Sequence, residues 1–272
     1  MLTILTRAAL WSAIGGILLA SSSAAATLKQ VEARFEVFGF AGIHLLTNRT
    51  TVEETPHRYQ ISTDLATRGL ARMFVDLTSH SAVHGALGSD TVQPRSYHSE
   101  VRRNGVDRHY GVDYGDNGAV IDATTSSPAS SKRPLLVTAQ QIRGTVDQLT
   151  AYFLVQRQVT DRGTCAMVVH VFDGSGLYDL RFTNLHREDL SADGHQNFTG
   201  PAQSCEVARE DIIVNPDRSD GTYQHGRIWY ARVAPGVGVM PVRMEYDTEF
   251  GVVKGYLAEV HGAGIDLRLT PE

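Results

Sequence analysis

Residues 171–182 read V-F-D-G-S-G-L-Y-D-L-R-F and bring two aspartates, a serine and a tyrosine close together. Such groups can act as nucleophile, general acid or cation ligand. However, Ser175 does not lie in the G-x-S-x-G pattern of a nucleophile elbow. The calcium-loop pattern, which ends in Glu at its twelfth position, is also absent. Because Asp-Gly stands between two alternating runs, the stretch predicts a hairpin with a four-residue turn over 173–176. A loop lining a ligand site is the alternative.

His80 and His84 are four residues apart, as two metal ligands on a helix would be. The surrounding S-H-S-A-V-H-G (79–85) reads as a loop, and the H-E-x-x-H motif is absent. We therefore expect surface histidines here, and no metal or other cofactor. G-V-G-V-M-P (236–241) lacks the third glycine of a dinucleotide loop, so we expect no nucleotide site.

Several arginines gather in residues 95–110, R-S-Y-H-S-E-V-R-R-N-G-V-D-R-H-Y. Asn104-Gly105 is a strong hairpin signal, so the simplest interpretation is a hairpin carrying solvated charges. The functional alternative is a rim of arginines that meets an anionic head group.

The first 26 residues have the pattern of a signal peptide. Arg7 precedes an apolar run over 8–20, and S-S-S-A-A-A (21–26) offers the small residues that signal peptidase requires. We expect cleavage between Ala26 and Thr27. A membrane anchor is the alternative, but about 13 apolar residues fall short of the roughly 20 that span a bilayer. The sequence thus predicts an exported, periplasmic chain with no membrane-spanning segment.

The full sequence has 25 Lys and Arg against 30 Asp and Glu, a net charge of −5. Loss of the N-terminal segment with Arg7 makes the mature chain slightly more negative. A nucleic-acid-binding surface would normally be basic, so no nucleic-acid partner is expected. The length suits a single β-rich domain over 27–272.

Cys165 and Cys205 are the two cysteines. In an oxidising compartment such a pair is most simply a disulfide, while free thiols remain the alternative. A metal site is less favoured, because neither cysteine has a second one nearby.

The mature sequence consists of short alternating segments separated by turn residues, as in V-E-A-R-F-E-V-F (31–38). About a dozen such segments predict a mainly β fold, a large antiparallel sheet curled on itself. The segments lie near 31–38, 43–52, 58–66, 69–77, 95–103, 107–114, 166–172, 177–185, 205–214, 227–233, 241–247, 252–258 and 264–269.

One stretch departs from this pattern. Residues 138–157 predict one helix, or two short ones, packed by an apolar face on the sheet. Thr145 with Gln148 fits a capping box, and Thr138 with Gln141 gives a weaker second start. The polar segment 123–134 before it is expected to be a loop.

Several motifs occur in an order that resembles a known family. They include F-E-V-F-G-F-A-G-I (35–43), C-A-M-V-V-H-V-F-D-G-S-G-L-Y-D-L (165–180) and M-P-V-R-M-E (240–245). The chain resembles the exported proteobacterial family of domain of unknown function 3108. G-F-A-G-I departs from the more typical paired-glycine turn. The matching motif residues, which we expect to be structural, are Asp173, Gly174, Asp179, Pro241 and Arg243.

The resemblance implies an open barrel or β-spiral with a helix packed on it, similar to periplasmic lipoprotein carriers. The family has no established catalytic residues to carry over. By shape alone, it suggests an apolar concavity for a lipid, an acyl chain or a peptide.

Three hypotheses follow. The first is an envelope-maintenance binding or scaffold protein with a lipid or envelope-protein partner, its concave face lined by Tyr152, Phe153, Phe172 and Tyr178. Ordinary core is the other interpretation of these four. The second is a hydrolase of envelope polymers, for which Asp173, Asp179 and Glu245 are the carboxylates to test. The third is a purely structural envelope interaction protein.

Overall fold

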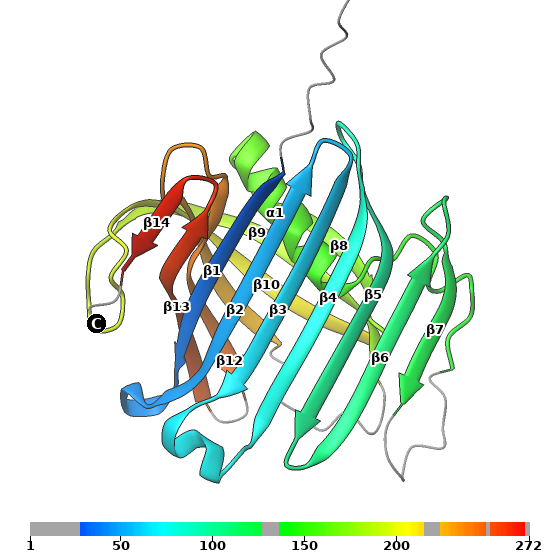
Figure 1. Cartoon of the computed structure of the whole chain (residues 1–272), viewed down its shortest axis with the longest axis horizontal. Helices are drawn as coiled ribbons and strands as arrows, with labels where there is room; N and C mark the ends of the chain where they lie inside the picture. The colour runs from blue at the N-terminus through cyan, green and yellow to red at the C-terminus, as the bar shows by residue number, and fades with distance from the viewer. Residues whose placement is uncertain (1–27, 127–135, 215–223, 249–250, 270–272) are drawn as a thin grey trace, which may run out of the picture.

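The computed structural model describes residues 28–126, 136–214, 224–248 and 251–269, and one antiparallel sheet dominates it (Figure 1). The sheet has fourteen strands in the order β7-β6-β5-β4-β3-β2-β1-β13-β12-β11-β10-β9-β8, and β14 pairs with β13. The strands are β1 Lys29–Phe38, β2 His44–Thr55, β3 Arg58–Thr67, β4 Leu77–Leu87, β5 Val92–Arg103, β6 Val106–Tyr114, β7 Val120–Ser126, β8 Met167–Phe172, β9 Gly176–Leu190, β10 Gly200–Val214, β11 His225–Arg232, β12 Val239–Thr248, β13 Gly251–Gly262 and β14 Ile265–Arg268.

The sheet curls but does not close. Its terminal strands are β7 and β8, and no ladder joins them in the described parts of the chain. The predicted large curved antiparallel sheet, forming an open barrel, is therefore confirmed. The helix α1, Gln148–Arg162, lies on the inner side of the curl, behind β1–β5 in Figure 1.

Alternation along strands such as β1 separates an apolar inner face from a charged outer face. In β1, Val31, Ala33 and Phe35 are buried, whereas Glu32 and Arg34 point to the other side. Full burial of one large apolar side chain is worth about 1.5–3 kcal/mol. This repeated gain fixes the pairing register, because a slip of one residue would turn the apolar set outward.

Three segment predictions are wrong. Residues 69–77 do not form a strand, since Gly69–Met73 is a short 3-10 helix, η2, that begins at a glycine with φ +52°. Residues 79–85 are not a loop but part of β4, where His80 pairs with Asp64 of β3. The predicted loop over 123–134 begins inside β7, and its residues 127–134 lie outside the described residues.

The predicted helix exists, but it begins and ends later in the chain than expected. Its N-cap is Asp147, whose side chain accepts a hydrogen bond from the Thr150 amide, so Thr145 does not cap it. Thr138 and Gln141 do bond each other's amides as a capping box would, at 2.8 and 3.4 Å, but only turns follow them. The helix ends at Arg162, where Gly163 adopts φ +68° as a C-cap.

Two hairpins agree with the sequence. Asn104-Gly105 joins β5 to β6 with φ +51° and +78°, as a tight two-residue turn requires. D-G-S-G (173–176) joins β8 to β9.

Cys165 and Cys205 form the predicted disulfide, which ties the segment after α1 to β10. No helix among the described residues has the length and hydrophobicity to cross a membrane. The predicted signal peptide, residues 1–26, with its cleavage site between Ala26 and Thr27, lies outside the described residues.

Candidate functional site

A groove of about 700 Å³ lies between the inner face of the sheet and helix α1. This volume lies within the usual range of 300–1,000 Å³ for small-molecule sites. Most of its surface is apolar, contributed by alternate residues of β1 to β3 and by β11 to β13. These lining residues are Val31, Ala33, Phe35, Val37, Leu46, Val52, Ile61, Leu65, Ile228, Tyr230, Met240, Pro241, Met244, Tyr246 and Val253.

Helix α1 forms the opposite wall of the groove, contributing Leu149, Tyr152, Phe153 and Arg157. The Phe153 ring stacks on that of Tyr59 in β3, with ring centroids 5.1 Å apart. The helix therefore packs on β3 through Phe153, and its side chains also form a wall of the groove.

A buried polar chain anchors the start of α1 to the sheet. The Thr150 hydroxyl donates to Asp147 at 2.6 Å and lies 2.8 Å from the Tyr59 hydroxyl. Burial raises the pKa of the Asp147 carboxyl to about 6, although the bonds from Thr150 favour the charged form. Fixing this end of the helix fixes the wall of the groove.

Polar groups within the groove are few and mostly paired. Asn48 donates to Thr63 at 2.8 Å, and Thr50 donates to Asn48 at 2.9 Å. Ser81 and Ser99 bond each other at 2.7 Å. The hydroxyl of Tyr152 is buried and has no hydrogen-bond partner among the described residues.

The charged lining residues share the region where β1 begins and β2 ends. Lys29 lies directly opposite Glu54 in the ladder, and Glu54 forms an ion pair with Arg157 of α1 at 3.3 Å. Asp161 lies one helical turn beyond Arg157. Most of the groove lining is therefore apolar, and its charged residues lie toward one end.

The structure divides the four predicted lining residues into two pairs. Tyr152 and Phe153 line the groove. Phe172 and Tyr178 are not among the lining residues and lie in the core beside the 173–176 turn. Tyr178 donates to Asp173 at 2.8 Å, and the guanidinium of Arg209 lies 3.4 Å from its ring centroid.

The D-G-S-G turn is organised by the buried carboxylate of Asp173. One of its oxygens accepts from the Ser175 amide, the Ser175 hydroxyl and the Gly176 amide, at 2.9, 2.6 and 3.1 Å. Gly174 adopts φ +76°, and its carbonyl accepts a bond of 2.6 Å from Thr125 in β7. The turn thus contacts the far end of the sheet, which the sequence gives no means of foreseeing.

The three carboxylates of the hydrolase hypothesis each contact different partners. Asp173 is engaged in the turn, Asp179 pairs with His170 at 2.6 Å, and Glu245 pairs with Arg243 and with Lys254. None of the three carboxylates lines the groove. Of the other motif residues, Pro241 lines the groove, and Arg243 stacks over the Trp229 ring at 4.6 Å.

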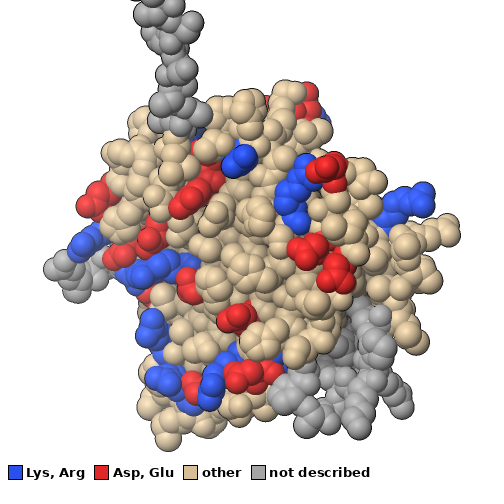
Figure 2. All heavy atoms as spheres, turned by 45° about the vertical axis from the view of Figure 1, so that its right-hand side comes forward, with Lys and Arg blue, Asp and Glu red and all other residues tan. Residues whose placement is uncertain are grey.

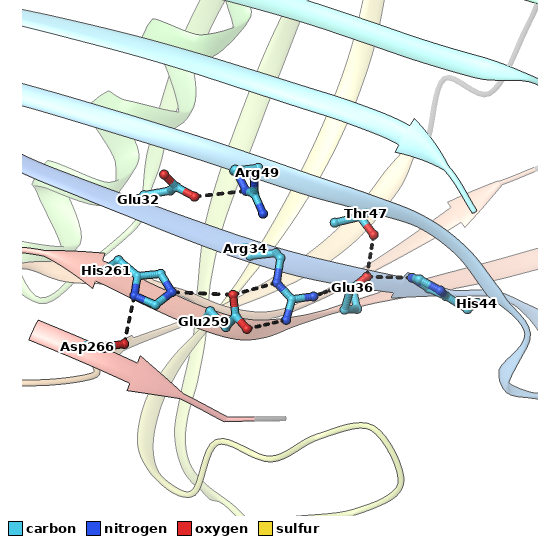
Figure 3. Close-up of polar contacts among 9 residues, drawn as sticks. All are labelled: Glu32, Arg34, Glu36, His44, Thr47, Arg49, Glu259, His261 and Asp266. Atoms are coloured by element: carbon cyan, nitrogen blue, oxygen red, sulfur yellow. Dashed lines mark hydrogen bonds and ion pairs between the residues drawn. The ribbon is translucent and has the colours of Figure 1, made fainter. Parts of the chain in front are cut away.

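The outer face carries a network of charges instead (Figure 3). Arg34 binds Glu259 through two nitrogens, at 2.9 and 2.8 Å, and also pairs with Glu36. This bidentate contact holds the pKa of Glu259 down at about 2. His80 is likewise paired with Asp64 at 2.8 Å, and no three His, Cys, Asp or Glu side chains of the described ranges are grouped as metal ligands.

A second hollow, of about 540 Å³, lies where β2 to β6 begin or end near the Asn104-Gly105 turn. Its lining includes four arginines, two histidines and three acidic residues, namely Arg49, Arg68, Arg102, Arg108, His80, His109, Asp64, Glu100 and Asp107.

Comparison with known proteins gives a family but no activity. The family DUF3108, described as a protein of unknown function, matches residues 34–258. No curated protein matches the sequence. The crystal structure of a beta-barrel-like protein of the domain of unknown function DUF1849 from Brucella abortus is 9% identical, with a TM-score of 0.48, over 87% of this chain and 99% of that chain. That of a "putative lipoprotein" from Parabacteroides distasonis is 12% identical, with a TM-score of 0.32, over 86% and 96%.

Proposed function

We propose that this chain, which belongs to the DUF3108 family of proteins of unknown function, holds a lipid or another acyl-chain molecule in its inner groove. The observation that carries this proposal is the groove of about 700 Å³ between the sheet and α1, with its largely apolar lining. Sites for small molecules are typically concave and apolar, with a few placed polar groups.

The distribution of polar groups favours an amphiphile over a wholly apolar molecule. The charged residues Lys29, Glu54 and Arg157 gather near one end of the groove and suit a polar head group.

The proposal places the protein in the periplasm, exported through the signal peptide over residues 1–26, as an envelope-maintenance protein. Its role there is to bind a lipid rather than to change it chemically. Three other functions compete with this proposal. The groove could bind a segment of a partner protein, or the protein could be purely structural or a hydrolase. The test below is designed to distinguish lipid binding from these.

A titration with a fluorescent acyl-chain probe tests the groove through two matched variants. Thr50 points into the groove, whereas its neighbour Thr51 lies on the opposite face of β2. Thr50→Trp fills the groove and should weaken probe binding by about ten-fold or more. Thr51→Trp adds the same bulk outside and should leave binding unchanged. Equal effects of the two variants, or no binding by the wild type, would reject the proposal.

A further inference from the structure

Three turns lie side by side along one edge of the sheet, the lower edge in Figure 1. They join β1 to β2, β3 to β4 and β5 to β6, and consecutive antiparallel strands bring every second turn to the same edge. We call residues 39–45, 67–78 and 101–109 the lower edge.

The first two turns carry large apolar side chains that point into solvent. Phe40 in the short 3-10 helix η1, Phe40–Gly42, is 87% exposed. Leu70, Met73 and Phe74, in or next to η2, are 70%, 79% and 82% exposed. Such residues are usually buried, and their concentration at one edge indicates a contact surface.

These turns are fixed to the sheet by backbone bonds. The Arg68 amide donates to the Leu45 carbonyl at 2.9 Å, which joins the second turn to the first. The Asp76 amide donates to the Asn104 side chain at 2.9 Å, and the Asn104 amide donates back to Asp76 at 2.7 Å. The turns that carry the apolar side chains are therefore hydrogen-bonded to their neighbours.

The lower edge is also basic in an acidic protein. It contains five arginines and two aspartates, a net charge of +3, whereas the whole chain carries −5. The charged hollow of about 540 Å³ adjoins it and is lined by three of these arginines, Arg68, Arg102 and Arg108. Figure 2 shows basic side chains, interspersed with acidic ones, toward the lower part of this face.

We propose that the lower edge docks on the surface of an anionic lipid bilayer. Phe40, Leu70, Met73 and Phe74 would enter the interfacial region, and the arginines would meet the lipid phosphates. The apolar side chains project from separate turns and are flanked by positive charge. That arrangement suits a fluid anionic surface better than a complementary protein, which would have to receive each of these side chains in a pocket of its own. The proposal concerns the edge of the sheet and does not require a ligand in the groove.

Flotation with lipid vesicles tests this docking. The full chain is expressed, and mass spectrometry checks that every purified variant has the same N-terminus. Vesicles of phosphatidylcholine with about 30 mol % phosphatidylglycerol are compared with pure phosphatidylcholine at low and at high salt. The wild type should partition about ten-fold better onto the anionic vesicles, and salt should weaken this preference.

Three double variants separate binding by the lower edge from nonspecific adsorption to lipid. Leu70→Ser with Phe74→Ser should lower partitioning by about ten-fold. The matched control changes two exposed residues elsewhere, Ile121 of β7 and Ile212 of β10, to serine and should bind as the wild type does. Arg68→Gln with Arg72→Gln should remove most of the preference for anionic vesicles. Thermal melting checks that all variants fold. Equal loss in the apolar double variant and its control overturns the proposal, as does a wild type that ignores anionic vesicles, whether or not it binds a protein at this edge.

Discussion

The hydroxyl of Thr125 in β7 donates a hydrogen bond of 2.6 Å to the carbonyl of Gly174, in the turn between β8 and β9. This contact joins the two ends of the open sheet, which no ladder connects in the described residues. The turn that first suggested a catalytic centre therefore acts as a clasp, held in shape by the Asp173 carboxylate.

Removing the clasp should destabilise the fold without altering the groove lining. Thr125→Val loses the bond to Gly174 and leaves a carbonyl unpaired, at a cost of about 1–2 kcal/mol in the free energy of unfolding. Thr124→Val, one position earlier on the same strand, is the control and should cost clearly less. Urea unfolding measures both variants, and equal losses would contradict the clasp.

A side chain at position 174 should destabilise the fold. It adopts φ +76°, and an added Cβ would lie 3.3 Å from the carbonyl oxygens of Gly111 and Thr124. Gly174→Ala should therefore cost about 1–3 kcal/mol through backbone strain and crowding. Gly105→Ala is the comparison, because Gly105 has φ +78° but open space around the added atom. A similar cost at both positions would show that strain alone is responsible.

The cap of α1 predicts a pH dependence of stability. Burial raises the pKa of Asp147 to about 6 from 3.8, so the folded protein holds this proton more tightly than the unfolded chain. This contribution to stability is fully present below pH 4 and is lost as the pH rises through 6. Its size is on the order of 3 kcal/mol.

Asp147→Asn removes the titration and keeps a capping oxygen. The stability of the variant relative to the wild type should therefore increase between pH 4 and pH 7. Denaturant unfolding curves across this pH range measure the difference in free energy of unfolding between the variant and the wild type. A difference that does not change with pH would refute a raised pKa.

Glu259 should act in the opposite direction. Arg34 holds its pKa down at about 2, below the ordinary 4.5. Its contribution is therefore present above pH 4.5 and is lost as the pH falls toward 2. Because the side chain is 22% exposed, we expect only about 1–2 kcal/mol. Glu259→Gln should be less sensitive to acid than the wild type between pH 5 and pH 2. An unchanged acid dependence would mean that the pair contributes nothing.

The disulfide gives a prediction with an internal control. Cys165 and Cys205 are 40 residues apart in sequence, so their bond should contribute roughly 4 kcal/mol in the chain-entropy model. Cys165→Ser and Cys205→Ser should lower stability by similar amounts, and the double variant should be no worse than either. Strongly unequal single variants would contradict a role that belongs to the bond itself.

Much of the architecture follows from local pattern. Alternation in β1 assigns Val31, Ala33 and Phe35 to one face, and these three residues do line the groove. The Asn104-Gly105 and 173–176 turns were also predictable from residue type. Leu46 and Val52 in β2 could have been found as groove residues by the same alternation.

Other features depend on contacts distant in sequence. No local signal tells that β1 pairs with β13, or that Phe153 of α1 shares a core cluster with Phe172 while Phe35 lines the groove. Phe172 and Tyr178 were reasonable lining candidates, yet the clasp buries them away from the groove. The predicted start of α1 was wrong because the Thr150 amide donates its hydrogen bond to Asp147, and not to Thr145.

Native mass spectrometry of the protein isolated gently from the cells that express it, before and after organic extraction, tests the proposed lipid binding most directly. If the groove holds a lipid, the wild type should carry a stoichiometric adduct with the mass of a lipid or acyl species, which extraction removes and which Thr50→Trp carries at much lower occupancy than Thr51→Trp. A clean apo mass for the wild type, with no acyl species in the extract, would contradict lipid binding in the groove.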